Sequence, residues 1–130
     1  LRVLLAEDND LNAEIACELL SESGLVVDRA VDGEKACGLF EASPVGTYDA
    51  VLMDIQMPGM DGLKATRILR EYARFDNLPI IAMTAHAMNG DREKSLSVGM
   101  QDYIAKPIEP SVLLSTLARW IHRDGRSPRR

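Results

Sequence analysis

The chain has 130 residues and a formal net charge of −5 at pH 7, and its length fits one domain. With 46% hydrophobic and 27% charged residues, it can bury a core and keep a polar surface. An acidic domain gives no reason to expect nucleic-acid binding, and no apolar run reaches the length of a membrane span. We therefore expect neither nucleic acid nor a membrane as a partner of this domain.

The two cysteines and the start of the chain bear on its location. Cys17 and Cys37 fall within predicted helices among apolar neighbours, and two cysteines do not make a disulfide framework. No signal peptide is visible, so we expect reduced thiols in a cytoplasmic domain. The chain begins at Leu1, already within a strand pattern. This start suggests a piece of a longer protein, and a membrane anchor elsewhere in that parent stays open.

Short apolar runs alternate with helical patterns along the whole chain. Runs that are apolar on both faces suit the strands of a parallel sheet covered by helices on both sides. The predicted strands are Arg2–Ala6, Val26–Ala30, Ala50–Met53, Ile80–Met83 and Tyr103–Ala105.

The first predicted helix runs from about Leu11 to Glu22, with Asp10 as its cap. Leu11, Ile15 and Leu19 recur at intervals of four residues, so this stripe is expected to face the core. The other helices are expected after Asp32, near Asp61-Gly62, after Asn89-Gly90 and near Glu109-Pro110.

Five strands that alternate with five helices predict an α/β fold, the flavodoxin-like (βα)5 doubly wound sheet. Right-handed crossovers and a switch point favour a five-stranded parallel sheet with strand order 2-1-3-4-5. In this order the first and third strands lie side by side. Their carboxyl ends then meet at the place where such sheets bind ligands.

Acidic residues follow both of these strands. Glu7 and Asp8 come directly after the first strand, and Asp54 follows the third strand before a Pro/Gly loop. An acidic pair alone is more often a solvated loop, but three neighbouring carboxylates repel one another unless a cation lies among them. Hard oxygen ligands favour Mg²⁺, with Mn²⁺ as an alternative ion. The backbone carbonyl of Gln56 is a further candidate ligand.

Two other strands end on residues that can hold a phosphoryl group. Asp54 can attack phosphorus as a nucleophile, and phosphoryl transfer depends mainly on charge neutralisation. Thr84 ends the fourth strand and Lys106 ends the fifth, immediately before Pro107. Alone, Thr84 reads as a helix cap and Lys106 as a surface charge. Four strand ends that all carry a suitable group are much harder to explain by coincidence.

The sequence around these positions resembles the receiver domains of two-component response regulators, and most closely the receivers of hybrid sensor histidine kinases. The resemblance covers nearly the whole chain, from Leu4 to Ile121. The segments that carry it are Leu4-Leu5-Ala6-Glu7-Asp8-Asn9, Met53-Asp54-Ile55-Gln56-Met57-Pro58-Gly59-Met60-Asp61-Gly62, Met83-Thr84-Ala85 and Lys106-Pro107.

The resemblance implies a phosphorelay domain made of residues 1–122, followed by a flexible basic tail or linker, 123–130. Asp54 is then the phosphate acceptor, and a histidine kinase or a histidine phosphotransfer domain is the donor. The domain would catalyse only its own phosphorylation and dephosphorylation, and whether the parent chain is a histidine kinase stays open.

The resemblance also implies a role for each neighbour of Asp54. Asp8, Asp54 and the Gln56 carbonyl would bind Mg²⁺, with Glu7 assisting through water. Thr84 and Lys106 would bind the phosphoryl oxygens. Thr84 would also act with Tyr103 as a conformational switch.

Three further expectations concern tuning, partner docking and the Lys106–Pro107 bond. The resemblance implies that His86 and Gln56 tune how fast water reaches the phosphorylated aspartate, although His86 is equally compatible with an exposed loop histidine. From helix geometry, Asn12, Ala13 and Ala16 lie off the predicted core stripe and beside the acid pair, which suggests a docking patch. The resemblance also favours a cis peptide bond between Lys106 and Pro107.

The main alternative functions are a phosphohydrolase and an interaction domain. An aspartyl-phosphate phosphohydrolase needs a second acid two residues after the nucleophile, and Gln56 occupies that position. An interaction domain that never takes phosphate stays open.

Overall fold

The computed structural model describes residues 1–44, 47–57, 59–71, 78–85 and 92–126. Within these ranges, five parallel strands form one sheet in the order β2-β1-β3-β4-β5. This topology confirms the predicted flavodoxin-like fold. The strands are β1 (Arg2–Ala6), β2 (Val26–Ala30), β3 (Ala50–Asp54), β4 (Ile80–Thr84) and β5 (Asp102–Ala105).

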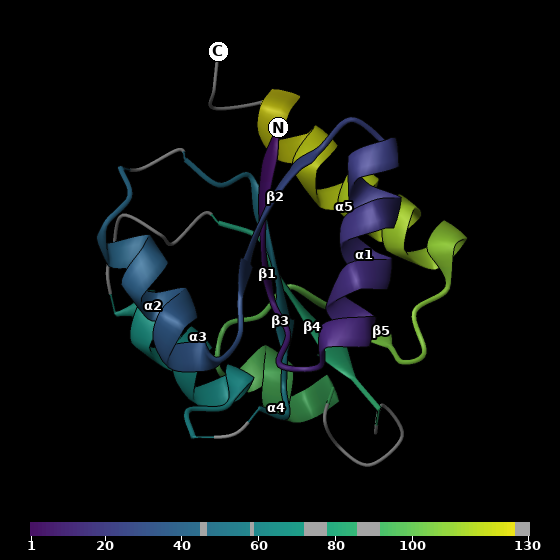
Figure 1. Ribbon diagram of the computed structural model, residues 1–130. Coiled ribbons are helices and arrows are strands. Elements are labelled where there is room, and N and C mark those ends of the chain that lie inside the picture. Colours follow the sequence, from purple (N-terminus) through teal and green to yellow (C-terminus); the bar gives the residue numbers. More distant parts are fainter. Residues whose placement is uncertain (45–46, 58, 72–77, 86–91, 127–130) are drawn as a thin grey trace.

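Helices cover both faces of the sheet (Figure 1). Helices α1 and α5 lie on one face, whereas α2 and α3 lie on the other. The bounds are α1 (Asp10–Glu22), α2 (Gly33–Glu41), α3 (Gly62–Arg70), α4 (Arg92–Ser97) and α5 (Pro110–Arg126). Among these helices, none combines the length and apolar character that a bilayer crossing requires.

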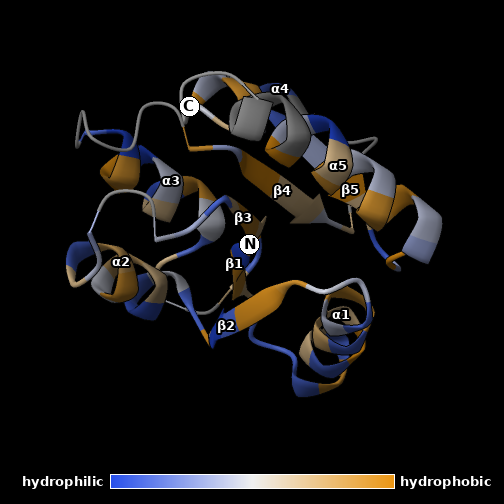
Figure 2. Cartoon of the chain, turned by 90° about the horizontal axis from the view of Figure 1, so that it is seen from above, coloured by the Kyte–Doolittle hydropathy of each residue, from blue (hydrophilic) through white to orange (hydrophobic). Residues whose placement is uncertain are grey.

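The core consists of two apolar clusters, one on each face of the sheet. Alternate residues of a strand point to opposite faces, so Leu4 and Ala6 join one cluster while Val3 and Leu5 join the other. Every residue of β3 and β4 is buried, and Figure 2 shows the apolar β4 between the helices. The central strands therefore fix the positions of the residues at their carboxyl ends.

The ends of several elements differ slightly from the prediction. Strands β3 and β4 each continue one residue further, through Asp54 and Thr84, and β5 begins one residue earlier, at Asp102. Asn9 rather than Asp10 caps α1, because the Asn9 side chain accepts a hydrogen bond from the Asn12 amide at 2.9 Å. Asp10 is already the first helical residue.

The predicted core face of α1 is wrong for Leu11 and Ile15, whereas Leu19 is partly buried against the core. Ala13 and Ala16 are 2% and 0% exposed, whereas Leu11 is 65% and Ile15 44% exposed. Small alanine side chains let the helix backbone approach the sheet closely, and Leu20 completes the buried face. The predicted docking patch is wrong for Ala13 and Ala16, which are inaccessible to a partner, whereas Asn12 is partly exposed and its role stays a prediction.

Helix α5 is fastened to the start of β5. It buries Leu113, Leu117 and Ile121. The Trp120 indole nitrogen donates to Asp102 Oδ2 at 3.0 Å, and Arg119 Nη1 lies 3.3 Å from the same oxygen. The helix continues to Arg126, beyond the expected boundary at residue 122. The Asn89-Gly90 start expected for the fourth helix lies outside the described residues.

Candidate functional site

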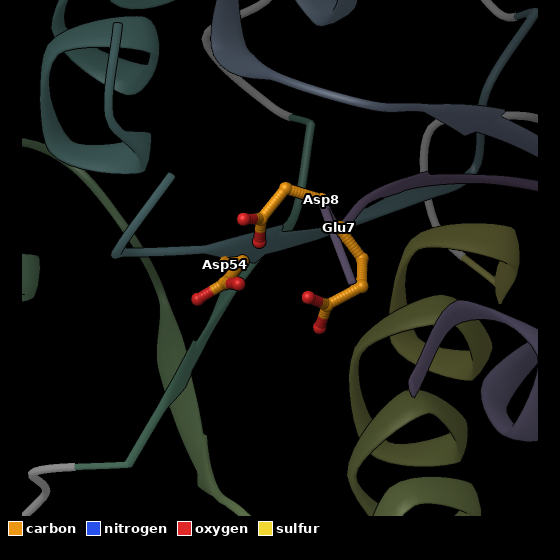
Figure 3. A group of neighbouring side chains, drawn as sticks. All are labelled: Glu7, Asp8 and Asp54. Carbon is orange, nitrogen blue, oxygen red and sulfur yellow. The ribbon is translucent and has the colours of Figure 1, made fainter. Parts of the chain in front are cut away.

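The three predicted acids meet where β1 and β3 end. The register pairs Ala6 with Met53, so the residues that follow on the two strands lie side by side. One ligand oxygen each from Glu7, Asp8 and Asp54 falls within 4.8 Å of the others (Figure 3). Glu7 and Asp54 are buried at 1% and 3% exposure, whereas Asp8 is exposed. The acidic cluster therefore has an inner, dry side and an outer side open to water.

Lys106 reaches the inner side of this cluster. Its ammonium lies 2.9 Å from Asp54 Oδ2 and 2.9 Å from Glu7 Oε1. The contact with Asp54 is a hydrogen bond. The contact with Glu7 is an ion pair without that alignment, so the buried Glu7 Oε1 accepts no hydrogen bond from the described residues. One lysine thus faces an excess of carboxylates.

Burial and the shared Lys106 shift the pKa values of Asp54 and Glu7 in opposite directions. Burial and the charge of Glu7 raise the pKa of Asp54 to about 6, although Lys106 opposes the rise. Burial also acts to raise the pKa of Glu7, but Lys106 and the Asn9 amide outweigh it and hold that pKa below its usual value. Burial acts to lower the pKa of Lys106, yet the two carboxylates raise it. A proton that enters this cluster therefore binds first to Asp54, and Lys106 stays charged.

The β3–α3 connection folds back closely onto Asp54. Asp54 Oδ1 accepts a hydrogen bond from the Gln56 amide at 3.1 Å, and the Gly62 amide donates to the Ile55 carbonyl at 3.0 Å. A Cβ at Gly62 would overlap the Asp54 carbonyl oxygen. Only glycine permits this approach, which holds the acid and the start of α3 together.

Thr84 and Lys106 come together from neighbouring strands, as the strand order predicts. The register pairs Thr84 with Ala105, and the Lys106 amide donates to the Thr84 carbonyl at 2.8 Å. Thr84 is 1% exposed. The Lys106–Pro107 peptide bond is cis, as expected from the resemblance.

The predicted switch and tuning residues are placed only in part. Tyr103 is partly buried and packs against the core cluster on the α2–α3 face. Gln56 is exposed and lines an open hollow of about 550 Å³ together with Asp8 and Lys94. His86 lies outside the described residues.

One contact at the site was missed by the sequence reasoning. Arg29 of β2 donates from Nε and Nη2 to the Glu7 carbonyl, at 3.0 and 2.8 Å. A single charged residue in an edge strand carries no sequence signal of this role, because many edge strands carry solvent-facing charges. The alternation of side chains places Arg29 on the α1 face, but its reach toward Glu7 depends on the tertiary fold.

Comparisons with known proteins agree with this geometry. The chain is 43% identical over 120 residues to hybrid signal transduction histidine kinase I of Dictyostelium discoideum, which covers 89% of this chain and 7% of that protein. It is 39% identical over 127 residues to the signal transduction histidine-protein kinase BarA of Escherichia coli K12, covering 98% and 14%. The chain thus spans only a small part of the curated relatives it matches.

Solved structures share the fold closely. The receiver domain of sensor histidine kinase PA1611 from Pseudomonas aeruginosa PAO1, described with a magnesium ion coordinated in its active site cleft, superposes with a TM-score of 0.85 at 41% identity. That match covers 93% of this chain and 97% of the other. The receiver domain of Saccharomyces cerevisiae Ssk1, solved with the histidine phosphotransfer protein Ypd1, gives a TM-score of 0.86 at 25% identity, covering 95% and 90%.

The family described as the response regulator receiver domain matches residues 3–118. This range contains every residue of the acidic cluster and all of the five strands except Arg2, the first residue of β1. The chain therefore belongs to the response regulator receiver domains of two-component phosphorelay systems.

Proposed function

We propose that Asp54 is the phosphate acceptor of this domain and that its phosphorylation depends on Mg²⁺. The observation that carries the proposal is the composition of the cluster. Three carboxylates and one lysine leave an excess of two negative charges when all are ionised. A single divalent cation neutralises this excess.

The donor atoms fit Mg²⁺ rather than a softer metal. All three side chains offer carboxylate oxygens, and Mg²⁺ prefers such hard ligands while it keeps several waters. Glu7 Oε1 is a buried acceptor without a hydrogen bond among the described residues, and the exposed Asp8 faces the water that a hydrated ion needs. Asp8, Asp54 and the Gln56 carbonyl are the proposed ligands, with Glu7 acting through water; Mn²⁺ is the alternative ion. Bound there, the ion would supply positive charge against phosphoryl oxygens.

The phosphoryl step follows from Asp54 itself. A carboxylate oxygen attacks phosphorus while the phosphorus–nitrogen bond of a phosphohistidine donor breaks. The bonding electrons return to the imidazole, which takes a proton from water. The ammonium of Lys106 lies 2.9 Å from the carboxylate before reaction, so it is in place to bind an oxygen of the transferred group.

Thr84 and Tyr103 are the proposed switch. Thr84 lies at the end of β4, and its carbonyl is tied to the Lys106 amide. Its hydroxyl is the natural second ligand for a phosphoryl oxygen. Tyr103 pairs with Ala82 on the adjacent strand, so a shift of Thr84 toward phosphate changes the space next to the tyrosine ring. Gln56 and His86 are the proposed tuning residues.

The donor is proposed to dock on the exposed apolar residues of α1. Leu11 and Ile15 are exposed large hydrophobic residues of α1. This helix begins at Asp10, shortly after Glu7 and Asp8. A helix that carries a phosphohistidine can cover them and still reach Asp54. In the related yeast complex, a receiver domain is bound to a histidine phosphotransfer protein.

The test is incubation of the chain with acetyl phosphate and Mg²⁺, followed by intact-mass measurement. One phosphoryl adduct is expected on the wild type and none on Asp54→Asn or without the metal. An adduct that survives Asp54→Asn would refute the assignment of the acceptor. Absence of any adduct on the wild type would favour the interaction domain, and turnover of external phosphate esters would favour the phosphohydrolase.

A second measurement tests the docking surface. Leu11→Glu and Ile15→Glu should slow transfer from a phosphorylated histidine phosphotransfer protein but leave labelling by acetyl phosphate unchanged. Leu96→Glu is the matched control, because Leu96 is equally exposed on α4 at 48%. Equal rates for all three variants would place the docking surface elsewhere.

A further inference from the structure

The side chain of Arg29, from β2, contacts both ends of the acidic loop, which runs from Glu7 to Asp10. The guanidinium of Arg29 donates through Nε and Nη2 to the Glu7 carbonyl. Its third nitrogen, Nη1, lies 2.8 Å from Asp10 Oδ1. Glu7 is the first residue after β1, and Asp10 is the first residue of α1. The arginine therefore spans the whole connection between strand and helix.

The orientation of the Glu7 carbonyl depends on its hydrogen bonds from Arg29. The last register pair between β1 and β2 is Ala6 with Ala30, so Glu7 lies beyond the paired region. Its amide still bonds to the Ala30 carbonyl at 3.0 Å, but its own carbonyl projects past the end of the paired strand. Two guanidinium nitrogens converge on that oxygen and fix the orientation of the peptide plane.

Asp8 has no such support from its own side chain. Within the described part of the chain, no hydrogen bond or ion pair is seen at its carboxylate, which is exposed. Its position is therefore set by the backbone on either side. Glu7 Oε2 accepts the Asn9 amide at 3.1 Å, and Arg29 holds the Glu7 carbonyl and Asp10. These contacts fix the loop that presents two proposed ligand residues.

We propose that Arg29 is a positioning residue for the cation site, which it organises through the Glu7 carbonyl and Asp10. The inference rests on the proposed Mg²⁺ site at Asp8 and Asp54. Arg29 is only 25% exposed while its partner Asp10 is 91% exposed, so the guanidinium is held against the loop rather than extended into water. Partners that orient metal ligands from outside commonly change metal affinity by about ten- to a hundredfold when removed.

The sign of the effect separates positioning from simple charge. A cation near the site repels Mg²⁺, so loss of its charge alone would tighten Mg²⁺ binding. Loss of positioning weakens it. Lysine keeps the charge but cannot give two parallel donors to one carbonyl and a third to Asp10. Arg29→Ala and Arg29→Lys are therefore both expected to weaken binding, whereas a charge effect would leave Arg29→Lys unchanged.

The experiment is calorimetric titration of the full chain with MgCl₂ at pH 8, well below the unfolding temperature of each variant. We expect Arg29→Ala to raise the Kd for Mg²⁺ about tenfold and Arg29→Lys to raise it in the same direction. Arg2→Ala is the matched control, because Arg2 pairs with Asp28 between the same two strands at 2.8 Å but lies at the other end of β1. Its Kd should equal that of the wild type even if its stability falls.

Each outcome has a separate meaning. Unchanged or tighter binding by both Arg29 variants would overturn the proposal while the Mg²⁺ site stands. If Arg29→Ala does not fold, Arg29→Lys alone decides, since it keeps the charge and most of the volume. If the wild type itself binds no Mg²⁺, or binds it equally well after Asp8→Asn, the proposed cation site has failed instead.

Discussion

Both ends of the sheet hold acidic and basic side chains, but the pKa of a carboxyl group is lowered at one end and raised at the other. Where β1 and β3 begin, the Asp28 carboxylate accepts from Arg2 and from the Tyr48 hydroxyl, at 2.8 and 2.9 Å. Burial acts to raise the pKa of Asp28, but these two donors outweigh it and lower that pKa. Where the same strands end, Asp54 shares Lys106 with Glu7, and its pKa is raised to about 6.

The difference distinguishes a structural cluster from a functional one. At the beginning of the strands, donors match acceptors, so the carboxylate contributes to stability by itself. At their end, the carboxylates outnumber the cations, and unfolding would relieve the repulsion among them. Stored repulsion of this kind is typical of sites that bind an ion or a reacting group. Four substitutions, each at one end of the sheet, test this contrast.

The largest effect is expected from Lys106→Met, measured by chemical unfolding at pH 8 in EDTA. The variant leaves two buried carboxylates without their shared cation, which should cost about 3 kcal/mol of unfolding free energy. Mg²⁺ should restore more stability to this variant than it adds to the wild type, because a dication can take over the role of the ammonium. The comparison with Arg2→Met sharpens the point, since that half-exposed pair should cost less than about 1 kcal/mol. Equal losses for the two variants would erase the contrast between the ends.

The next effect is a gain in stability from Asp54→Asn that depends on pH. The pKa of Asp54 is about 6 in the folded chain, against an ordinary value of 3.8. Its contribution to the free energy of unfolding is therefore fully present below pH 3.8 and is lost as the pH rises through 6. The variant lacks this decline. In EDTA its advantage over the wild type should therefore grow between pH 4 and pH 7, to about 3 kcal/mol, and stay constant above.

For Asp28→Asn, the stability difference from the wild type is expected to have the opposite sign in the same measurement. Because the pKa of Asp28 is lowered, its charge stabilises the fold above the ordinary pKa, and this contribution disappears as the pH falls through the folded value. The variant should therefore lose stability relative to the wild type at neutral pH and approach it in acid. If the stabilities of the two variants, relative to the wild type, changed with pH in the same direction, the contrast between the two ends of the sheet would be contradicted.

The smallest effect is expected from Tyr48→Phe. The variant removes the hydroxyl that donates to Asp28 but keeps the edge-to-face contact with Phe40, whose ring centroid lies 5.3 Å away. We expect a loss of about 1 kcal/mol in thermal or chemical unfolding. Labelling by acetyl phosphate should not change, because this cluster lies away from the acidic site. A change in labelling would show that the two ends are coupled.

The site was largely predictable because its residues follow strands. A buried strand gives a clear apolar run, and the polar residue that ends the run has a defined place at the edge of the sheet. Asp54, Thr84 and Lys106 were found in this way, and the strand order then brought Glu7 and Asp8 beside Asp54. None of these steps required knowledge of side-chain packing.

The face of α1 was not predictable for a physical reason. Both of its faces carry apolar residues, and the larger side chains of Leu11 and Ile15 made the wrong face look like the core. The buried face uses Ala13 and Ala16, because close packing on the sheet favours small side chains. Arg29 was missed because its partners are a backbone carbonyl and a distant carboxylate. Such contacts leave no periodic pattern in a sequence.

The bond between Trp120 and Asp102 has a practical consequence. The sequence contains one tryptophan, and its indole is anchored to the residue next to Tyr103. Its emission spectrum therefore arises from a single place, the junction of β5 and α5. A fluorimeter can follow that junction in real time, without a label, while Mg²⁺ or acetyl phosphate is added to the acidic site at the far end of the strands.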